Sequence, residues 1–310
     1  MCGIAGIVQL NSAWGNDQLR GHLEIMSEAI AHRGPDDQGI WIADDGRVGL
    51  AHRRLSIIDL SKNAHQPMPA NDQRYIISFN GEIYNFLELR VELEALGARF
   101  HTSSDTEVLL ESFRFWGAAC LNRIDGMYAF AIYDQYNGEL FAARDPFGEK
   151  PFYYAWVNNA FVFASELTAI SGLPEFRHIT NKVLIAKFLC FQYVDGEETI
   201  YSQAKKLTPG HFLTLNQDGI LHLERFFRFE PGINPSFAST DALTDELEDI
   251  LTRSVERRLR ADVPVGGFLS GGVDSALVMA LVKRKLGRDI ATFTIGFEGW
   301  AGSEHSDAEQ

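Results

Sequence analysis

The apolar pattern of the first third of the chain predicts strands alternating with helices. A strand is expected at about residues 3 to 9, and a helix follows that Gly34 and Pro35 end. Short strands are then expected at about 40–42, 48–51 and 75–79. The buried face of the first helix recurs at helical spacing in Leu19, Leu23, Met26 and Ile30.

Two more helices are expected before residue 120. Asn85 is placed to cap the first of them, which Gly97 would end. The second would begin at Ser104, which has capping-box spacing with Glu107, and would run to Gly117.

From Gly126 onward the apolar period changes to two, which predicts antiparallel strands. The segments GMYAFAIYD and GELFAAR flank a turn containing Asn137-Gly138, and PFYYAWV and AFVFASE repeat the pattern across Asn158-Asn159. A short helix near 182–189 and a hairpin in HFLTLNQDGILHLERFF complete this part. A large number of antiparallel strands, with helices before and between them, predicts an α+β domain in which helices cover stacked sheets.

A second domain is expected after a change in composition at residues 229–240, FEPGINPSFAST, which is typical of a linker. A long amphipathic helix then precedes a buried-type strand in VPVGGFL, a helix in SALVMALVKRKL and a strand in IATFTIGF. This order is a βαβ unit and implies a parallel sheet. We therefore expect domains at 2–228 and 241–310, joined by 229–240.

Composition narrows the classes of function. The 310 residues carry a net charge of −14, which argues against a nucleic-acid partner or an anionic membrane surface. There is no apolar run of a length that spans a bilayer and no positively charged residue before GIAGIV, so we expect a cytoplasmic protein. The three cysteines, Cys2, Cys120 and Cys190, have neither a disulfide pattern nor a zinc-site spacing, and we assign no metal ligand.

Cys2 has a chemical option that no other side chain in the chain has. Removal of Met1 would leave a thiol and a free α-amine on one residue, so that a nucleophile and a weak base adjoin. Free cysteines more often serve as small buried hydrophobes, and MCGIAGI by itself favours that role.

The segment LSGGVDS, between an expected strand and an expected helix, is a candidate phosphate-binding turn. Glycines let backbone N–H groups point outward, and the helix N-terminus adds partial positive charge. No Gly-Lys-Ser/Thr follows and no G-x-G-x-x-G occurs, so it is not a Walker A or dinucleotide loop. Its Ser-Gly-Gly-x-Asp-Ser form resembles the PP-loop of ATP pyrophosphatases.

A family resemblance covers essentially the whole chain. Nine segments occur in the order found in glutamine-hydrolysing asparagine synthetases: MCGIAGI, HRGPDDQG, AHRRLSIID, NGEIYN, SSDTE, GMYAFAIYD, RDPFGEKPFYY, FASE and LSGGVDS. The resemblance implies a class II glutamine amidotransferase domain with the N-terminal nucleophile hydrolase αββα sandwich. The start of an α/β PP-loop synthetase domain would follow it.

The resemblance also implies roles for individual residues. Cys2 would attack the glutamine carboxamide, and Asn80 and Gly81 would form the oxyanion hole. Arg54 would clamp the glutamine α-carboxylate, and Glu82 and Asp105 would hold its α-ammonium. Taken singly, Arg54, Asp105 and Asn80-Gly81 would be better explained as a surface charge, a helix-start charge and an ordinary turn. As a set with the spacing of the family, they favour the functional roles. We expect His32, Arg33, Asp36, Arg144 and Asp145 to order loops beside the site.

In the second domain the resemblance implies an ATP site with Mg²⁺ alongside the phosphates. Aspartate would be adenylated and then attacked by ammonia to give asparagine, AMP and pyrophosphate. Dimerisation is implied as well. The residues expected to contact ATP are Leu269, Ser270, Gly271, Gly272, Asp274 and Ser275.

Two alternatives stay open, and one expectation concerns the length of the chain. The ammonia acceptor could be another carboxylate, such as a cell-envelope sugar acid, or the chain could be an inactive regulatory or binding module. Family synthetase domains continue well beyond the position of Gln310, so we expect a fragment or truncated product that hydrolyses glutamine and makes little or no asparagine.

Overall fold

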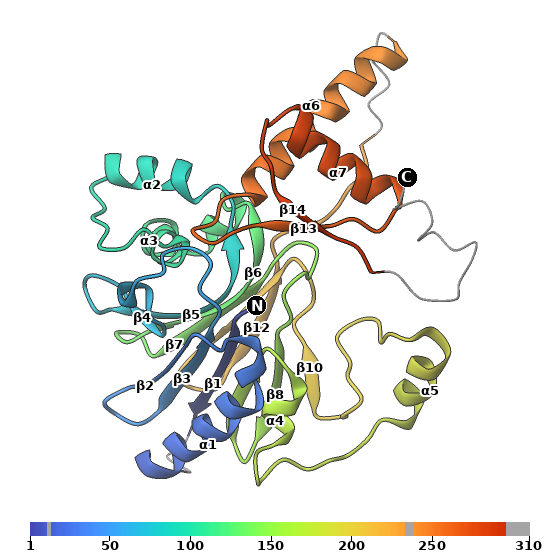
Figure 1. Ribbon diagram of the computed structural model, residues 1–310. Helices are drawn as coiled ribbons and strands as arrows, with labels where there is room; N and C mark the ends of the chain where they lie inside the picture. Colours follow the sequence, from blue (N-terminus) through green and yellow to red (C-terminus); the bar gives the residue numbers. More distant parts are fainter. Residues whose placement is uncertain (11–13, 233–238, 296–310) are drawn as a thin grey trace. The chain divides into compact units, whose positions relative to one another are not determined.

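The computed structural model describes residues 1–10, 14–232 and 239–295. The chain divides into two compact units, Met1–Phe229 and Glu230–Gln310, which are described separately (Figure 1). No helix among the described residues combines the length and apolar character needed to cross a bilayer.

The first unit is built on two six-stranded sheets, in which every pairing is antiparallel. The first sheet has the strand order β10-β8-β9-β1-β3-β2 and the second β12-β11-β7-β6-β5-β4. The strands of the first sheet are β1 Gly3–Gln9, β2 Asp37–Ile42, β3 Val48–Arg54, β8 Tyr153–Val157, β9 Ala160–Ala164 and β10 Ala204–Lys206. Those of the second are β4 Met68–Pro69, β5 Tyr75–Ile83, β6 Gly126–Asp134, β7 Glu139–Arg144, β11 His211–Leu215 and β12 Leu221–Arg225.

Three clusters of buried apolar side chains hold the layers of the first unit together. One lies between the two sheets, and the other two lie between each sheet and the helices that cover it. Alternation along β1 divides its side chains, because Ile4 and Val8 enter the core between the sheets whereas Ala5 and Ile7 face the helices on the outer side. Helices α1 (Asn16–Ala29) and α4 (Leu167–Ser171) cover the first sheet. Helices α2 (Phe86–Ala95) and α3 (Asp105–Trp116) cover the second (Figure 1). The unit is therefore a four-layered αββα sandwich, as expected.

Two capping predictions were wrong in detail. Asn85 stands at the N-cap of α2, but its side chain bonds to Arg123 and Asp125 of a distant loop instead of to the helix. Ser104 does cap α3, since its hydroxyl accepts from the Thr106 amide at 3.1 Å. Glu107 instead binds the His101 and Thr102 amides, so no reciprocal capping box forms. A distant loop outcompeted the helix for Asn85, whereas Glu107 binds the turn just before α3 in place of the Ser104 amide.

The predicted secondary structure is otherwise confirmed over most of the first unit. The expected strand at 3–9 is β1, the expected first helix is α1, and both predicted hairpins form, as β6-β7 and β8-β9. The helix expected near 182–189 is α5 (Lys182–Phe191), and the last hairpin is β11-β12.

The second unit contains the predicted βαβ arrangement. Strands β13 (Gly266–Phe268) and β14 (Ala291–Phe293) pair in parallel, and α7 (Val273–Arg284) connects them. Helix α6 (Thr240–Arg258) precedes them and packs along α7. Residues 233–238 of the expected linker lie outside the described residues.

Candidate active site

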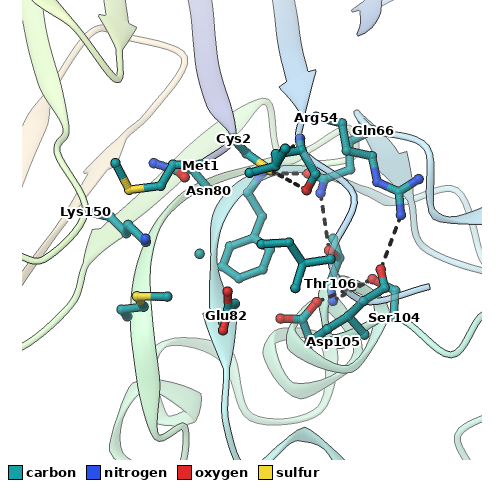
Figure 2. Close-up of a pocket in the computed structure, with 16 residues that line it drawn as sticks. Met1, Cys2, Arg54, Gln66, Asn80, Glu82, Ser104, Asp105, Thr106 and Lys150 are labelled. Atoms are coloured by element: carbon teal, nitrogen blue, oxygen red, sulfur yellow. Dashed lines mark hydrogen bonds between the residues drawn. The ribbon is translucent and has the colours of Figure 1, made fainter. Parts of the chain in front are cut away.

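A pocket of about 130 Å³ opens in the first unit, where the start of β1 meets the ends of β3 and β5 (Figure 2). Segments distant in the sequence contribute to it, because β1 and β3 of the first sheet lie close to β5 of the second. Its lining comprises Met1, Cys2, Arg54, Leu55, Ile57, Ile58, Gln66, Phe79, Asn80, Gly81, Glu82, Ser104, Asp105, Thr106, Met127 and Lys150. All six residues expected at the glutamine site are therefore brought together.

Cys2 lies directly before β1 and borders the pocket. Its Sγ is 3.4 Å from the Leu55 amide nitrogen, which donates to it, and 3.6 Å from the Leu55 carbonyl oxygen. Burial raises the pKa of the thiol above its ordinary value. The sulfur therefore needs a neighbouring base or positive charge to act as a nucleophile.

The segment before β2 fixes the main chain at Cys2. The Arg33 Nε donates to the Cys2 carbonyl oxygen at 2.9 Å, and its Nη1 pairs with Glu166 at 2.9 Å. Glu166 also binds His32 at 3.0 Å, and Asp36 accepts from the Ser56 amide at 2.8 Å. These contacts match the loop-ordering role expected for His32, Arg33 and Asp36.

Asn80 presents an amide group without a partner. Its side chain is 1% exposed, and neither Nδ2 nor Oδ1 has a hydrogen bond within the described part of the chain. An unsatisfied buried amide costs about 1–3 kcal/mol, so its retention in a pocket is typical of a group whose partner is a ligand.

Gly81, next on β5, allows the close approach of β6. A Cβ at this position would lie 2.3 Å from the Met127 carbonyl oxygen and 2.8 Å from the Tyr128 Cα. Since both are backbone atoms of the paired strand, only glycine fits.

Two side chains that the sequence patterns do not single out hold β5 in place. The Gln66 amide accepts from the Phe79 N–H at 2.7 Å and donates to the Thr106 hydroxyl at 3.2 Å, and so ties β5 to α3. His52 of β3 lies 2.9 Å from the Phe79 carbonyl oxygen through Nε2. Burial lowers the pKa of His52 to about 4, so the ring is neutral and donates this bond. Both contacts fix the residue just before Asn80.

Asp105 is the first residue of α3 and projects into the pocket (Figure 2). One carboxylate oxygen accepts from the Ile83 amide at 3.0 Å. Burial, together with the nearby charge of Glu82, raises the pKa of Asp105 to about 7 against the opposing effect of that bond. A carboxylate in this state gains most from a cationic ligand, because the ligand would offset the cost of its burial.

Arg54, the last residue of β3, is engaged more fully than expected. Its Nη1 donates to the Ser61 carbonyl oxygen at 3.0 Å, and its Nη2 donates to the carbonyl oxygens of Asp59 and Ile58, the latter at 3.3 Å. Both Nη2 hydrogens are therefore used by the chain. A bidentate clamp on a carboxylate would require at least one of these bonds to be released.

Lys150 is a further charged residue of the pocket (Figure 2). Its side chain is buried, and burial lowers the pKa of its ammonium. The motif RDPFGEKPFYY contains it, so the sequence offered an indication, but neither spacing nor charge marks it as facing the pocket.

The candidate nucleotide loop follows β13 in the second unit. Gly271 has a φ of 84°, a conformation that favours glycine, and Gly272 is the N-cap of α7. The hydroxyls of Ser270 and Ser275 lie 3.1 Å apart, and Asp274 is exposed in the first turn of α7. Leu269 donates from its amide to the Phe293 carbonyl oxygen at 2.9 Å, which fixes the loop to β14.

The first unit has the fold of N-terminal nucleophile hydrolases. Two stacked antiparallel sheets lie between helical layers, and a cysteine at the start of a central strand faces a pocket. A solved structure named glutamine phosphoribosylpyrophosphate amidotransferase from B. subtilis, complexed with ADP and GMP, matches 94% of this chain and 65% of its own. The match has a TM-score of 0.53 and 21% identity.

The chain belongs to the glutamine amidotransferase domain family, whose model matches residues 1–227. The asparagine synthase model matches residues 246–310. Asparagine synthetase [glutamine-hydrolyzing] 1 of Bacillus subtilis is 38% identical over the whole of this chain and 48% of its own length. Asparagine synthetase [glutamine-hydrolyzing] 3 of the same organism is 33% identical over 96% of this chain and 48% of its own. The chain thus spans about half the length of these relatives.

Proposed function

We propose that the first unit hydrolyses glutamine to glutamate and ammonia through Cys2. The observation that carries the proposal is the unpartnered, buried amide of Asn80 in the same pocket as the Cys2 sulfur. A donor placed beside a nucleophile can hold an oxyanion, and such a donor contributes about 2.7–4 kcal/mol to transition-state stabilisation. Glutamine is the substrate implied by the family and by the names of the relatives.

The reaction would proceed through a covalent intermediate. After removal of Met1, the Cys2 sulfur attacks the carboxamide carbon, and the thiol proton passes to the α-amine of Cys2. Asn80 Nδ2 and the Gly81 N–H hold the resulting oxyanion. The amine then protonates the leaving nitrogen, which departs as ammonia and leaves a γ-glutamyl thioester. Water, deprotonated by the same amine, cleaves the thioester to release glutamate and restore the thiol.

Charged residues of the pocket would position the rest of glutamine. The raised pKa of Asp105 supports its pairing with the α-ammonium, and Glu82 lines the same side. Arg54 would take the α-carboxylate after exchanging a backbone carbonyl for it, which is a closer definition of the role inferred from the family.

The test is glutamate release by the native chain and by Cys2→Ser. We expect the variant to lose at least about a thousandfold in kcat, as is usual for loss of a nucleophile. Cys190→Ser, which changes an exposed thiol, is the matched control and should keep full activity. Intact-mass measurement would establish whether Met1 is removed from active material. Equal rates for Cys2→Ser and the native chain would end the proposal, as would full activity with Met1 retained.

We further propose that the second unit belongs to an asparagine synthetase half. The match of residues 246–310 to the asparagine synthase model supports this, as does the glycine-rich turn at the N-terminus of α7. The backbone N–H groups of this turn would face the phosphates of ATP, with which aspartate is adenylated before ammonia yields asparagine. The residues proposed to bind ATP are Leu269, Ser270, Gly271, Gly272, Asp274 and Ser275.

Mg²⁺ would act here through the nucleotide. No group of three or more His, Cys, Asp or Glu suited to a metal ion occurs in the described ranges, so the phosphates would supply most of its ligands. The ion would neutralise phosphate charge. A homodimer and a cytoplasmic location, in keeping with three unpaired thiols, complete the proposal.

The acceptor is tested by pyrophosphate release with ATP, ammonia and candidate carboxylates, in a chain as long as the relatives. Aspartate should be the preferred acceptor, and Asp274→Ala should abolish synthesis while leaving glutaminase intact. Cys2→Ser should do the reverse and spare synthesis from ammonia. Preference for a sugar acid would replace aspartate as acceptor, and equal damage to both half-reactions by either variant would refute the division into two sites.

A further inference from the structure

A rigid loop delivers Lys150 to the glutaminase pocket. The fully buried carboxylate of Asp145 accepts from the amides of Phe147, Glu149 and Lys150, at distances of 2.9–3.0 Å. Arg144 donates from Nε to the Lys150 carbonyl oxygen at 2.7 Å. The backbone of Lys150 is thus fixed on both sides, and its side chain enters the pocket (Figure 2).

The Lys150 ammonium has no hydrogen bond or ion pair to any residue in the described part of the chain. The residue is nevertheless only 5% exposed, so its ammonium faces the pocket and has lost part of its contact with bulk water. Two other cations near Cys2 differ in this respect, since Arg54 of the pocket binds three carbonyls and Arg33, which binds the Cys2 carbonyl, also binds Glu166. An unpaired charge of this kind is typical of a functional group.

Charged groups from several elements surround this ammonium. Those that act on it are Glu82 of β5, Glu149 of its own loop, Arg33 of the segment before β2, and the Cys2 thiol. Met1, Cys2 and Lys150 line the same pocket, so the amine that Cys2 would carry after loss of Met1 starts beside this lysine. Burial lowers the pKa of the present Met1 amine, Arg33 and Lys150 lower it further, and Cys2 and Glu82 raise it. Asp105 and Arg54 also act on the Cys2 sulfur, in opposite directions.

A cation beside Cys2 changes the ionisation of the groups that take part in glutamine hydrolysis. Positive charge disfavours a protonated amine and favours a thiolate or an oxyanion close to it. We propose that Lys150 is a positioning residue for glutamine hydrolysis, whose ammonium keeps the proton-relaying amine of Cys2 neutral and favours the ionised sulfur. This inference rests on the proposed glutaminase function.

The test is the pH profile of kcat/KM for glutamine in the native chain and three variants. Lys150→Met keeps an unbranched side chain one atom shorter and removes the charge, whereas Lys150→Arg keeps the charge. Lys205→Met removes an exposed lysine charge away from the pocket and is the matched control. We expect the acidic limb of the Lys150→Met profile to move up by about one pH unit, with about tenfold lower activity below the limb and little loss above it.

Lys150→Arg should restore the native profile, and Lys205→Met should follow it throughout. An unmoved acidic limb in Lys150→Met would overturn the proposal, as would a uniform loss at every pH or a rise in KM alone. Thermal unfolding of each variant identifies a misfolded protein, and in that case Lys150→Gln replaces Lys150→Met under the same criteria. The glutaminase proposal fails separately, through the activity of Cys2→Ser, which does not depend on Lys150.

Discussion

Replacing Asp105 by asparagine tests whether the pocket holds a carboxylate at the expense of stability. The amide side chain of Asp105→Asn would keep an oxygen toward the Ile83 N–H, so the bond at 3.0 Å can persist, while the buried charge is removed. The rise in pKa from the ordinary value of 3.8 to about 7 means that ionisation of Asp105 opposes folding. This rise corresponds to about 4 kcal/mol at a pH above both values.

The introduced amide would face the Ser104 and Thr106 donors less well than the carboxylate does, at a cost of about 1–3 kcal/mol. We therefore expect Asp105→Asn to raise the free energy of unfolding by about 2 kcal/mol at about pH 8. Because the folded-state pKa is raised, the cost of ionisation is absent below 3.8, grows up to about 7 and is constant above it. The gain should thus vanish at about pH 5, where the cost of ionisation equals that of the amide, and the variant should be the less stable protein at lower pH.

Urea unfolding followed by tryptophan fluorescence measures this difference, since four of the five tryptophans lie in the first unit. Asp134→Asn is the matched control. Arg74 lowers the pKa of Asp134 despite burial, so this substitution should destabilise the chain at neutral pH. In the same samples, Asp105→Asn should raise the KM for glutamine by about 10- to 100-fold through loss of the ammonium partner. A variant no more stable at high pH, or with an unchanged KM, would refute the reasoning.

Three further substitutions probe the parts of the site separately. Asn80→Ala should lower kcat by about 100- to 1000-fold with little change in KM in steady-state assays. A large rise in KM alone would contradict that role. Gly81→Ala should destabilise the first unit by about 3 kcal/mol or more in urea unfolding, because its Cβ would lie 2.3 Å from the Met127 carbonyl oxygen. Asp145→Ala should cost about 3 kcal/mol by orphaning the amides of its loop, and a loss under about 1 kcal/mol would disprove this.

Periodicity was sufficient to predict the layers of the first unit. Alternating residues of β1 face opposite cores, and the hairpin turns are encoded within a few residues. Capping at Asn85 was mispredicted because its partners lie in a distant loop, which no local pattern reveals. Capping at Glu107 was mispredicted because the turn at 101–102 offers it amides that the capping-box spacing does not take into account.

The candidate site, like the fold, was predictable from the sequence only in part. The family motifs contained every residue that we expected at the glutamine site, from Cys2 to Asp105, although their spacing along the chain carries no geometry. The bonds of Arg54 to the carbonyls of 58–61 and the bridge of Gln66 between β5 and α3 depend on backbone positions and could not be deduced. Lys150 was missed for a related reason, because an exposed and a pocket-facing lysine have the same sequence pattern.

The late strands of the first unit set a limit on how far a working glutaminase could be shortened. Every described side chain that lines the pocket comes from the first 150 residues, yet β8, β9 and β10 form half of the first sheet. In the second sheet, β11 borders β7 and β12 borders β11. A polypeptide ending at Lys150 would hold all the pocket residues and still leave β1 and β7 as bare, apolar edges open to aggregation. The minimal autonomous enzyme should therefore extend at least to Arg225, the end of β12.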